Sequence, residues 1–295
     1  MNGLTPWQRF RDTAARLTPR HRRWERFLRE LPLDPSELES PIAPPGRDDF
    51  IICGCPRTGT TLVAAVLFQP PQVVTCMEPW DGMRLPPADL FASLRDEVEK
   101  TGKLSRGRLD LYELRRTGRV RWCREGKVAA DVSVEPSWLL GVKWPGYWRY
   151  LQCLPETRFI VCLRDPTEVI ASFKAAGGRV AEGLQYDTTF NRDMNSELLE
   201  ATSDPALRRV LLFEYVHKRL IPYLTNRQVL VVRYERWFED RDALLGDISR
   251  FLGCSVTARH VELKRSTTVG ALSPRDHDLI AQHCSTASEL GYRVN

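Results

Sequence analysis

The stretch FIICGCPRTGTTL, residues 50–62, decides the fold. It begins with the apolar run Phe50–Cys53, which is typical of a buried strand. Gly54 and Gly59 follow with the spacing G-x-x-x-x-G, and an apolar segment of helical length covers residues 60–68. A loop of this kind between a strand and a helix directs successive backbone N–H groups at a phosphate. The stretch therefore predicts a phosphate-binding loop in an α/β domain.

The rest of the main domain alternates short apolar runs with helical segments. The further runs that we expect to form strands are 73–76, 139–142, 159–163 and 229–232. The further segments that we expect to be helical are 146–154, 166–174, 193–224, 240–252 and 273–290. Apolar strands that alternate with helices are typical of a parallel sheet covered by helices on both faces. We therefore expect a three-layer α/β fold.

Residues 1–49 have a different character. Thr5-Pro6 and Thr18-Pro19 each place a capping hydroxyl before a proline at the first helical position. A proline-rich stretch over residues 32–49 then leads into the main domain. We interpret residues 1–49 as a helical N-terminal arm and linker, and residues 50–295 as the main domain. An arm that packs on the domain or forms a homodimer is favoured over one that binds nucleic acid.

Composition limits the classes of function. The chain has 43 Lys and Arg against 38 Asp and Glu, and this excess is too small and too dispersed to predict a nucleic-acid partner. Its eight cysteines include no Cys-x-x-Cys pair and no Cys/His metal spacing. No apolar stretch is long enough to cross a membrane. We expect a cytoplasmic protein with reduced thiols, no metal and no membrane span.

The phosphate loop departs from that of nucleoside triphosphatases. Thr60 follows the second glycine, where those proteins have lysine, and the cation lies earlier in the loop as Arg57. The loop resembles the 5′-phosphosulfate loop of sulfotransferases that depend on PAPS (3′-phosphoadenosine-5′-phosphosulfate). The resemblance covers roughly residues 50–290 and implies a P-loop-like fold with a parallel central sheet of about five strands flanked by helices. It implies that the donor is bound by Pro56, Arg57, Thr58, Gly59, Thr60 and Thr61.

A second match lies after the run FIVCL at 159–163. Arg164 ends this run and Ser172 lies eight residues later, on the predicted helix. In the sulfotransferases that the chain resembles, such a pair holds the 3′-phosphate of PAPS. The carboxyl end of a strand and the following helix can converge on one anion. The alternative is that Arg164 forms a buried ion pair with Asp165 and Ser172 has no role.

The third match is Val232-Arg233-Tyr234-Glu235, at the end of the last predicted strand. The family commonly has Tyr-Glu at this point, near the 3′-phosphoadenosine. Tyr234 could donate to a phosphate, pack on the adenine, or be a core tyrosine.

The predicted catalytic base is a carboxylate. Cytosolic small-molecule sulfotransferases use a histidine, but the comparable segment here reads Val142-Lys143-Trp144-Pro145. Glu78 follows the strand predicted at 73–76, and tyrosylprotein and some bacterial carbohydrate sulfotransferases place a catalytic Glu at about this point. Glu78 is therefore the candidate general base, with an ion pair to a neighbouring Arg as the alternative. Lys143 matches a Lys-x-Pro of the same relatives and would stabilise the leaving phosphate, as would Arg57.

The segment Arg265-Ser266-Thr267 resembles an Arg-Ser-Thr of the tyrosylprotein enzymes, which makes Ser266 a candidate contact of the leaving oxygen. Together the motifs predict sulfuryl transfer from PAPS, with 3′,5′-ADP as product. The expected acceptor is a hydroxyl of a small molecule, saccharide or glycolipid, in a bacterial enzyme of secondary metabolism. Residues 81–138 would form an acceptor-side insertion. The alternatives are a small-molecule kinase and a non-catalytic protein that binds 3′-phosphorylated nucleotides.

Overall fold

The computed structural model describes residues 42–46, 49–121, 123, 130–186, 189–265 and 272–293. The predicted helical arm and the candidate Ser266 lie outside these residues. Within them, no helix is both long and apolar enough to cross a membrane.

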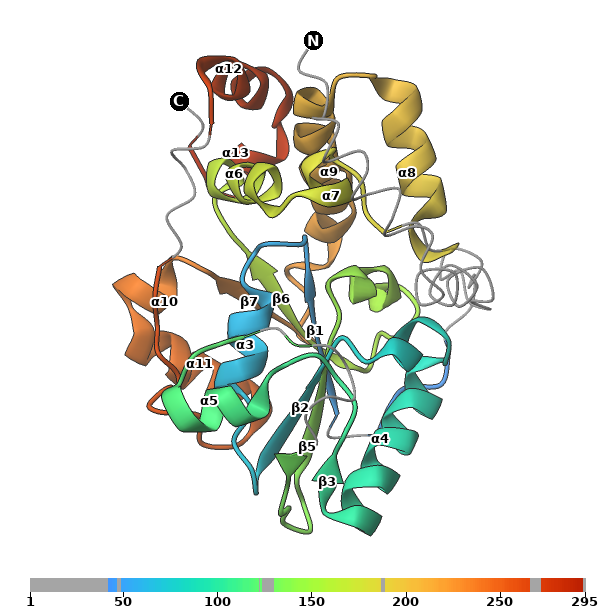
Figure 1. Ribbon diagram of the computed structural model, residues 1–295, viewed down its shortest axis with the longest axis vertical. Helices are drawn as coiled ribbons and strands as arrows, with labels where there is room; N and C mark the ends of the chain where they lie inside the picture. The colour runs from blue at the N-terminus through green and yellow to red at the C-terminus, as the bar shows by residue number, and fades with distance from the viewer. Residues whose placement is uncertain are drawn as a thin grey trace, which may run out of the picture.

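Five parallel strands form the central sheet (Figure 1). They are β1 (Phe50–Gly54), β2 (Val73–Met77), β5 (Leu139–Lys143), β6 (Arg158–Leu163) and β7 (Val229–Arg233). Their order across the sheet is β2-β5-β1-β6-β7, and every neighbouring pair is parallel. Each strand forms where an apolar run predicted it, which confirms the fold class.

The register of the sheet brings the candidate site residues to one edge. β1 is buried along its whole length because all its residues are small or apolar. Met77 in β2 pairs with Lys143 in β5, and Leu163 in β6 pairs with Arg233 in β7. Since the carboxyl ends of parallel strands meet at one edge, the residues that follow these strands gather there.

Helices flank the sheet (Figure 1). Those in contact with its strands include α3 (Thr60–Val66), α4 (Pro87–Thr101), α10 (Arg236–Glu239) and α11 (Arg241–Leu252). A second group gathers at the top in Figure 1 and comprises α6 (Pro166–Ala176), α7 (Gly178–Ala181), α8 (Thr189–Ala201), α9 (Pro205–Leu220), α12 (Pro274–His283) and α13 (Thr286–Glu289). The short 3₁₀ helices are η2 (Trp80–Met83), η3 (Pro145–Leu151) and η4 (Ile221–Tyr223).

Two of the predicted helices are interrupted. The stretch predicted as helical over 193–224 divides into α8, α9 and η4, because Pro205 begins a new helix and Asp204 caps it by accepting a hydrogen bond from the Ala206 N–H. The last predicted helix likewise ends at Cys284, before α13. The segment predicted as a helix over 146–154 forms η3, a 3₁₀ helix.

The segment 81–138 contains regular structure that packs on the main core. Besides η2 and α4, it includes α5 (Leu111–Thr117) and a small antiparallel pair of strands, β3 (Lys103–Leu104) and β4 (Ala130–Asp131). The apolar face of α4 is buried in the core cluster through Leu90, Phe91, Leu94 and Val98. Its assignment as an acceptor-side insertion stays a prediction.

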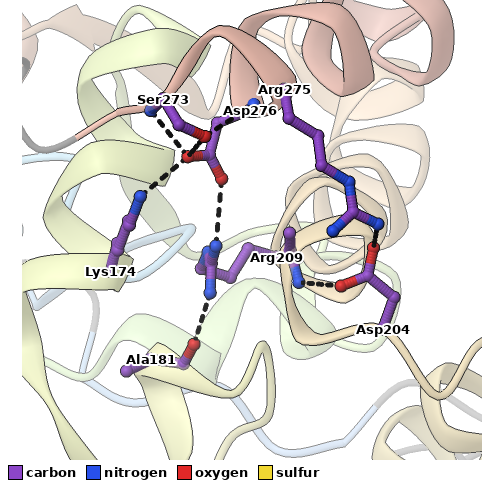
Figure 2. Close-up of polar contacts among 8 residues, drawn as sticks. Lys174, Ala181, Asp204, Arg209, Ser273, Arg275 and Asp276 are labelled. Carbon is purple, nitrogen blue, oxygen red and sulfur yellow. Dashed lines mark hydrogen bonds and ion pairs between the residues drawn. The ribbon is translucent and has the colours of Figure 1, made fainter. Parts of the chain in front are cut away.

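The buried carboxylate Asp276 fastens α12 to the helix that carries Ser172 (Figure 2). Its oxygens accept from Lys174 of α6 at 2.8 Å and from Arg209 of α9 at 3.1 Å. Asp276 also completes a capping box with Ser273. Burial alone would raise the pKa of Asp276, but the hydrogen bonds from Lys174, Ser273 and Arg209 outweigh burial and hold the pKa well below its usual range. The carboxylate therefore stays ionised and holds the three helices together.

Candidate functional site

A cavity of about 700 Å³ lies at the carboxyl edge of the sheet, where β1, β2, β5, β6 and β7 end. It brings together candidates from the three predicted donor-binding motifs and both strand-end candidates, namely Pro56, Arg57, Gly59, Thr60, Thr61, Glu78, Lys143, Arg164, Ser172 and Tyr234. Thr58 is absent from the lining, because its buried hydroxyl donates to the Cys55 carbonyl at 2.6 Å and braces the loop. Motifs separated by more than a hundred residues in sequence thus share one pocket.

The loop requires glycine at position 59, because the surrounding structure leaves no space for a side chain. The residue is left-handed with φ 96°, a conformation that glycine adopts without a steric penalty. A Cβ atom at Gly59 would lie 2.7 Å from Cδ2 of the Tyr234 ring. The loop therefore packs against the tyrosine after β7, and this contact joins the first and third motifs.

Arg57 and Glu78 are the non-glycine residues with positive φ in the described part of the chain, at 72° and 49°. Left-handed conformations are unfavourable for side chains other than glycine, asparagine and aspartate, and they cluster at functional sites. Both residues are ones that the sequence singled out for chemistry. The backbone strain is an independent reason to place function at these two positions.

Arg57 links the phosphate loop to α6. Its Nε donates to Ser172 Oγ at 2.9 Å. Removal from water and repulsion by Arg164 lower the pKa of Arg57, while Glu78 raises it, so all these charges interact. The loop predicted to bind the 5′-phosphosulfate and the helix predicted to bind the 3′-phosphate are thus joined by a direct hydrogen bond.

Three groups hold Arg164 in place. Its guanidinium contacts the Glu168 carboxylate at 2.7 Å and donates from Nη1 to the Arg57 carbonyl at 3.2 Å. It also lies over the Tyr234 ring, 4.0 Å from the ring centre. The ion pair of Arg164 is therefore with Glu168 and not with Asp165, which caps α6 by accepting from the Thr167 N–H at 2.8 Å.

Glu168 could have been found in the sequence. It lies four residues after Arg164, in the first turn of α6, so the two opposite charges belong to one strand-to-helix connection. Its second oxygen accepts from Arg265 at 3.0 Å. Glu168 thereby ties the C-terminal segment to the arginine predicted to bind the 3′-phosphate.

Glu78 and Lys143 form an ion pair at the adjoining ends of β2 and β5. Lys143 Nζ donates to Glu78 Oε1, and the lysine side chain is 2% exposed against 18% for the glutamate. The Glu78 N–H also donates to the Lys143 carbonyl at 2.7 Å. The predicted base and the predicted leaving-group cation therefore contact each other in this structure.

Arg108 is a site residue that the motifs did not reveal. Its Nη1 lies 3.8 Å from Glu78 Oε2, on the side of the carboxylate opposite Lys143. The Arg108 N–H donates to the Met77 carbonyl at 2.7 Å, which fixes this loop beside β2. The preceding Gly107 has φ 98°, and a Cβ there would lie 3.1 Å from Cys76 Sγ. Only this close approach of two distant segments brings Arg108 to the site.

The arrangement suits a polyanion. Arg57, Arg108, Lys143 and Arg164 line one cavity, and glutamates partly balance their charge. A phosphorylated ligand could replace the glutamates as partner of these cations. Among the described residues, no group of three or more His, Cys, Asp or Glu is arranged to hold a metal ion.

Comparisons with known proteins concern the family of the chain. Residues 49–258 match the family described as "Sulfotransferase family", while curated protein sequences include no significant match. Similar solved structures include the sulfotransferase domain from the curacin biosynthetic pathway, at 14% identity, 87% coverage of this chain, 100% of that chain and TM-score 0.46. A sulfotransferase from Alicyclobacillus acidocaldarius has 16% identity, with 85% and 98% coverage and TM-score 0.42.

The mouse sulfotransferase SULT7A1 complexed with PAP has 14% identity, with 88% and 72% coverage and TM-score 0.36. The family match spans the phosphate loop, Glu78, Lys143, the Arg164–Ser172 pair and Tyr234. The chain belongs to the sulfotransferase family.

Proposed function

We propose that this protein transfers the sulfuryl group of PAPS to a hydroxyl of an acceptor molecule. One observation carries the proposal. A single cavity holds the phosphate loop, a buried arginine–serine pair and a strained carboxylate that is paired with a lysine. Its volume of about 700 Å³ is in the range of small-molecule sites.

The residues present fit such a donor. Residues 56–61 would hold the 5′-phosphosulfate, with Gly59 keeping the loop open and Arg57 balancing its charge. Arg164 and Ser172, 4% and 2% exposed, would hold the 3′-phosphate, which distinguishes PAPS from ATP. The Tyr234 ring beneath Arg164 supports its guanidinium.

The chemistry follows from where the charges lie. Bound PAPS supplies the sulfuryl group together with a phosphate leaving group. Glu78 would accept the proton of the acceptor hydroxyl as its oxygen attacks sulfur. Lys143 and Arg57 would stabilise the negative charge that develops on the leaving phosphate. When the donor binds, the ammonium of Lys143 has to leave the Glu78 carboxylate and contact the donor phosphate instead. The carboxylate is then free to act as a base.

The acceptor class and the cellular setting complete the proposal. We propose a small molecule, saccharide or glycolipid as acceptor, within bacterial secondary metabolism. All eight cysteines are free thiols, which favours a reducing cytoplasm. A homodimer and a role for Ser266 stay predictions.

Calorimetric titration tests the donor directly. We expect 3′,5′-ADP to bind without added metal, and far more tightly than 5′-AMP or Mg-ATP, because only 3′,5′-ADP satisfies Arg164 and Ser172. Preference for Mg-ATP would instead support a kinase. Absence of nucleotide binding would overturn the proposed function. If 3′,5′-ADP binds but the Glu78→Gln variant behaves as the wild type in every assay, the non-catalytic alternative gains support.

A further inference from the structure

The cavity has two chemically distinct regions. Its charged side chains follow the sheet strands or the loop beside β2, and they serve the donor and the transfer step. A second set of lining residues comes from the helices around the cavity instead: η2, η3, α7, α8 and α9. We call this set the apolar wall, and it consists of Met83, Trp144, Trp148, Val180, Met194 and Val216.

The apolar wall is part of the packed interior. Met83, Trp148, Met194 and Val216 are only 8%, 7%, 2% and 1% exposed, yet each lines the cavity. Trp144 and Val180 are partly exposed, and the four buried side chains hold a fixed shape, so the apolar wall is preformed. Methionines also adapt to irregular shapes. Water against such a surface is displaced favourably by an apolar group.

The six side chains of the apolar wall outnumber the three polar side chains that line the cavity from α7 to α9. Among the described lining residues from α7 to α9, Gln185 and Asn191 carry side-chain amides and Tyr186 carries a hydroxyl. The buried Nε2 of Gln185 has no hydrogen-bond partner among the described residues, and its NH2 group carries two donors. A saccharide brings several hydroxyls, and each one buried without a partner is penalised. The wall therefore matches an apolar ligand better than a sugar.

We propose that the acceptor is an alcohol on an apolar aliphatic or aromatic body, and that it enters with its hydroxyl toward Glu78 and its body along the apolar wall. This inference rests on the proposed function and names its acceptor class. In the transfer step the acceptor oxygen forms a bond to sulfur while the bond from sulfur to the phosphate oxygen breaks. The hydroxyl proton passes to Glu78, and 3′,5′-ADP leaves with the electron pair.

A series of primary alcohols tests the proposal on the unmodified protein. Butan-1-ol, hexan-1-ol and octan-1-ol are compared as acceptors with ³⁵S-labelled PAPS, beside glucose and methyl glucoside. Each methylene buried on the apolar wall should raise kcat/KM about fourfold, or roughly 250-fold from butanol to octanol. Chain-length independence, or transfer to the sugars in preference to octanol, overturns the proposal.

A matched pair of variants on α8 locates the effect. Met194→Gln places an amide on the apolar wall and should lower kcat/KM for octanol at least tenfold, with little change for butanol. Leu199→Gln is the control, because Leu199 lies on the same helix but is 51% exposed and does not line the cavity. Equal effects of the two substitutions would contradict the assignment. Met194→Leu should preserve the chain-length dependence and shows whether the site tolerates substitution.

Titration of each preparation with 3′,5′-ADP separates the two proposals. If 3′,5′-ADP does not bind to the wild type, the proposed function fails and this inference fails with it. If 3′,5′-ADP binds and no chain-length dependence is found, only the acceptor class is wrong. Normal 3′,5′-ADP binding by Met194→Gln shows that its loss of octanol transfer is not caused by unfolding.

Discussion

Replacement of Glu78 by glutamine should separate the structural role of this residue from its chemical role. The substitution keeps the shape of the side chain and removes its charge. Lys143 is then left with an ammonium group that is 2% exposed and has lost its carboxylate partner. Arg108, whose Nη1 is 3.8 Å from the same carboxylate, loses a charge partner as well. The variant should therefore be less stable as well as inactive.

The magnitude follows from burial. Removal of one partner from a buried ion pair costs about 3–5 kcal/mol. Because the Glu78 side chain is 18% exposed, we expect the lower end, about 3 kcal/mol. For a chain of this size that corresponds to a decrease in Tm of roughly 6–12 °C. Loss of a general base should lower kcat by roughly 10²–10⁴. Binding of 3′,5′-ADP should be kept or strengthened, because Lys143 no longer has to leave a carboxylate partner before it contacts the donor phosphate.

The double variant Glu78→Gln, Lys143→Met is the decisive control. The double variant has neither the carboxylate nor the buried ammonium, so no unpaired charge is left in the interior. Most of the lost stability should therefore return, while turnover stays absent. Thermal and urea denaturation followed by circular dichroism measure stability, and radiolabelled transfer measures turnover. If Glu78→Gln melts like the wild type and the double variant shows no coupling, the ion pair does not form in solution. Normal turnover of Glu78→Gln would remove it as the base, whatever its stability.

Three further predictions concern other residues. Arg164→Ala should weaken calorimetric binding of 3′,5′-ADP far more than that of 5′-AMP, because the buried guanidinium is assigned to the 3′-phosphate; equal losses would contradict this assignment. Lys143→Met should lower kcat more than it raises the KM for PAPS in steady-state assays, and the reverse pattern would make Lys143 a binding residue. Burial lowers the pKa of His217 to about 4 despite its hydrogen bond to the Phe213 carbonyl. The unfolded chain therefore binds the proton first as pH falls from about 6.5 to 4, and the folded state loses roughly 1.4 kcal/mol per pH unit across that window. His217→Gln should flatten this slope in denaturant titrations, and an unchanged slope would assign it to other groups.

Local patterns were sufficient for the parts of the fold that depend on neighbours in sequence. The five strands formed at their apolar runs, because a short apolar run is enough to specify a strand that is buried, as in β1, β2, β5 and β6, or partly buried, as in the edge strand β7. The helix over 193–224 was predicted as continuous because its apolar spacing persists. The break at Asp204-Pro205 is also local, and a proline preceded by a capping residue was the signal that should have been used.

The motif residues were recognisable because each phosphate-binding element is continuous in sequence. The loop at 56–61 and the Arg164–Ser172 pair each lie on one strand-to-helix connection, so their spacing carries the geometry. Glu168 belongs to the same class, since it lies on the same strand-to-helix connection as Arg164.

Other features depend on the order of strands, which no local pattern encodes. β2 and β5 are separated by the whole segment 78–138, and only their pairing sets Glu78 against Lys143. Arg108 reaches the same carboxylate because a glycine lets its loop approach Met77 closely. The apolar wall likewise collects side chains from separate helices. Sequence spacing describes contacts within one connection, whereas contacts between connections exist only once the sheet has brought its strand ends to a common edge.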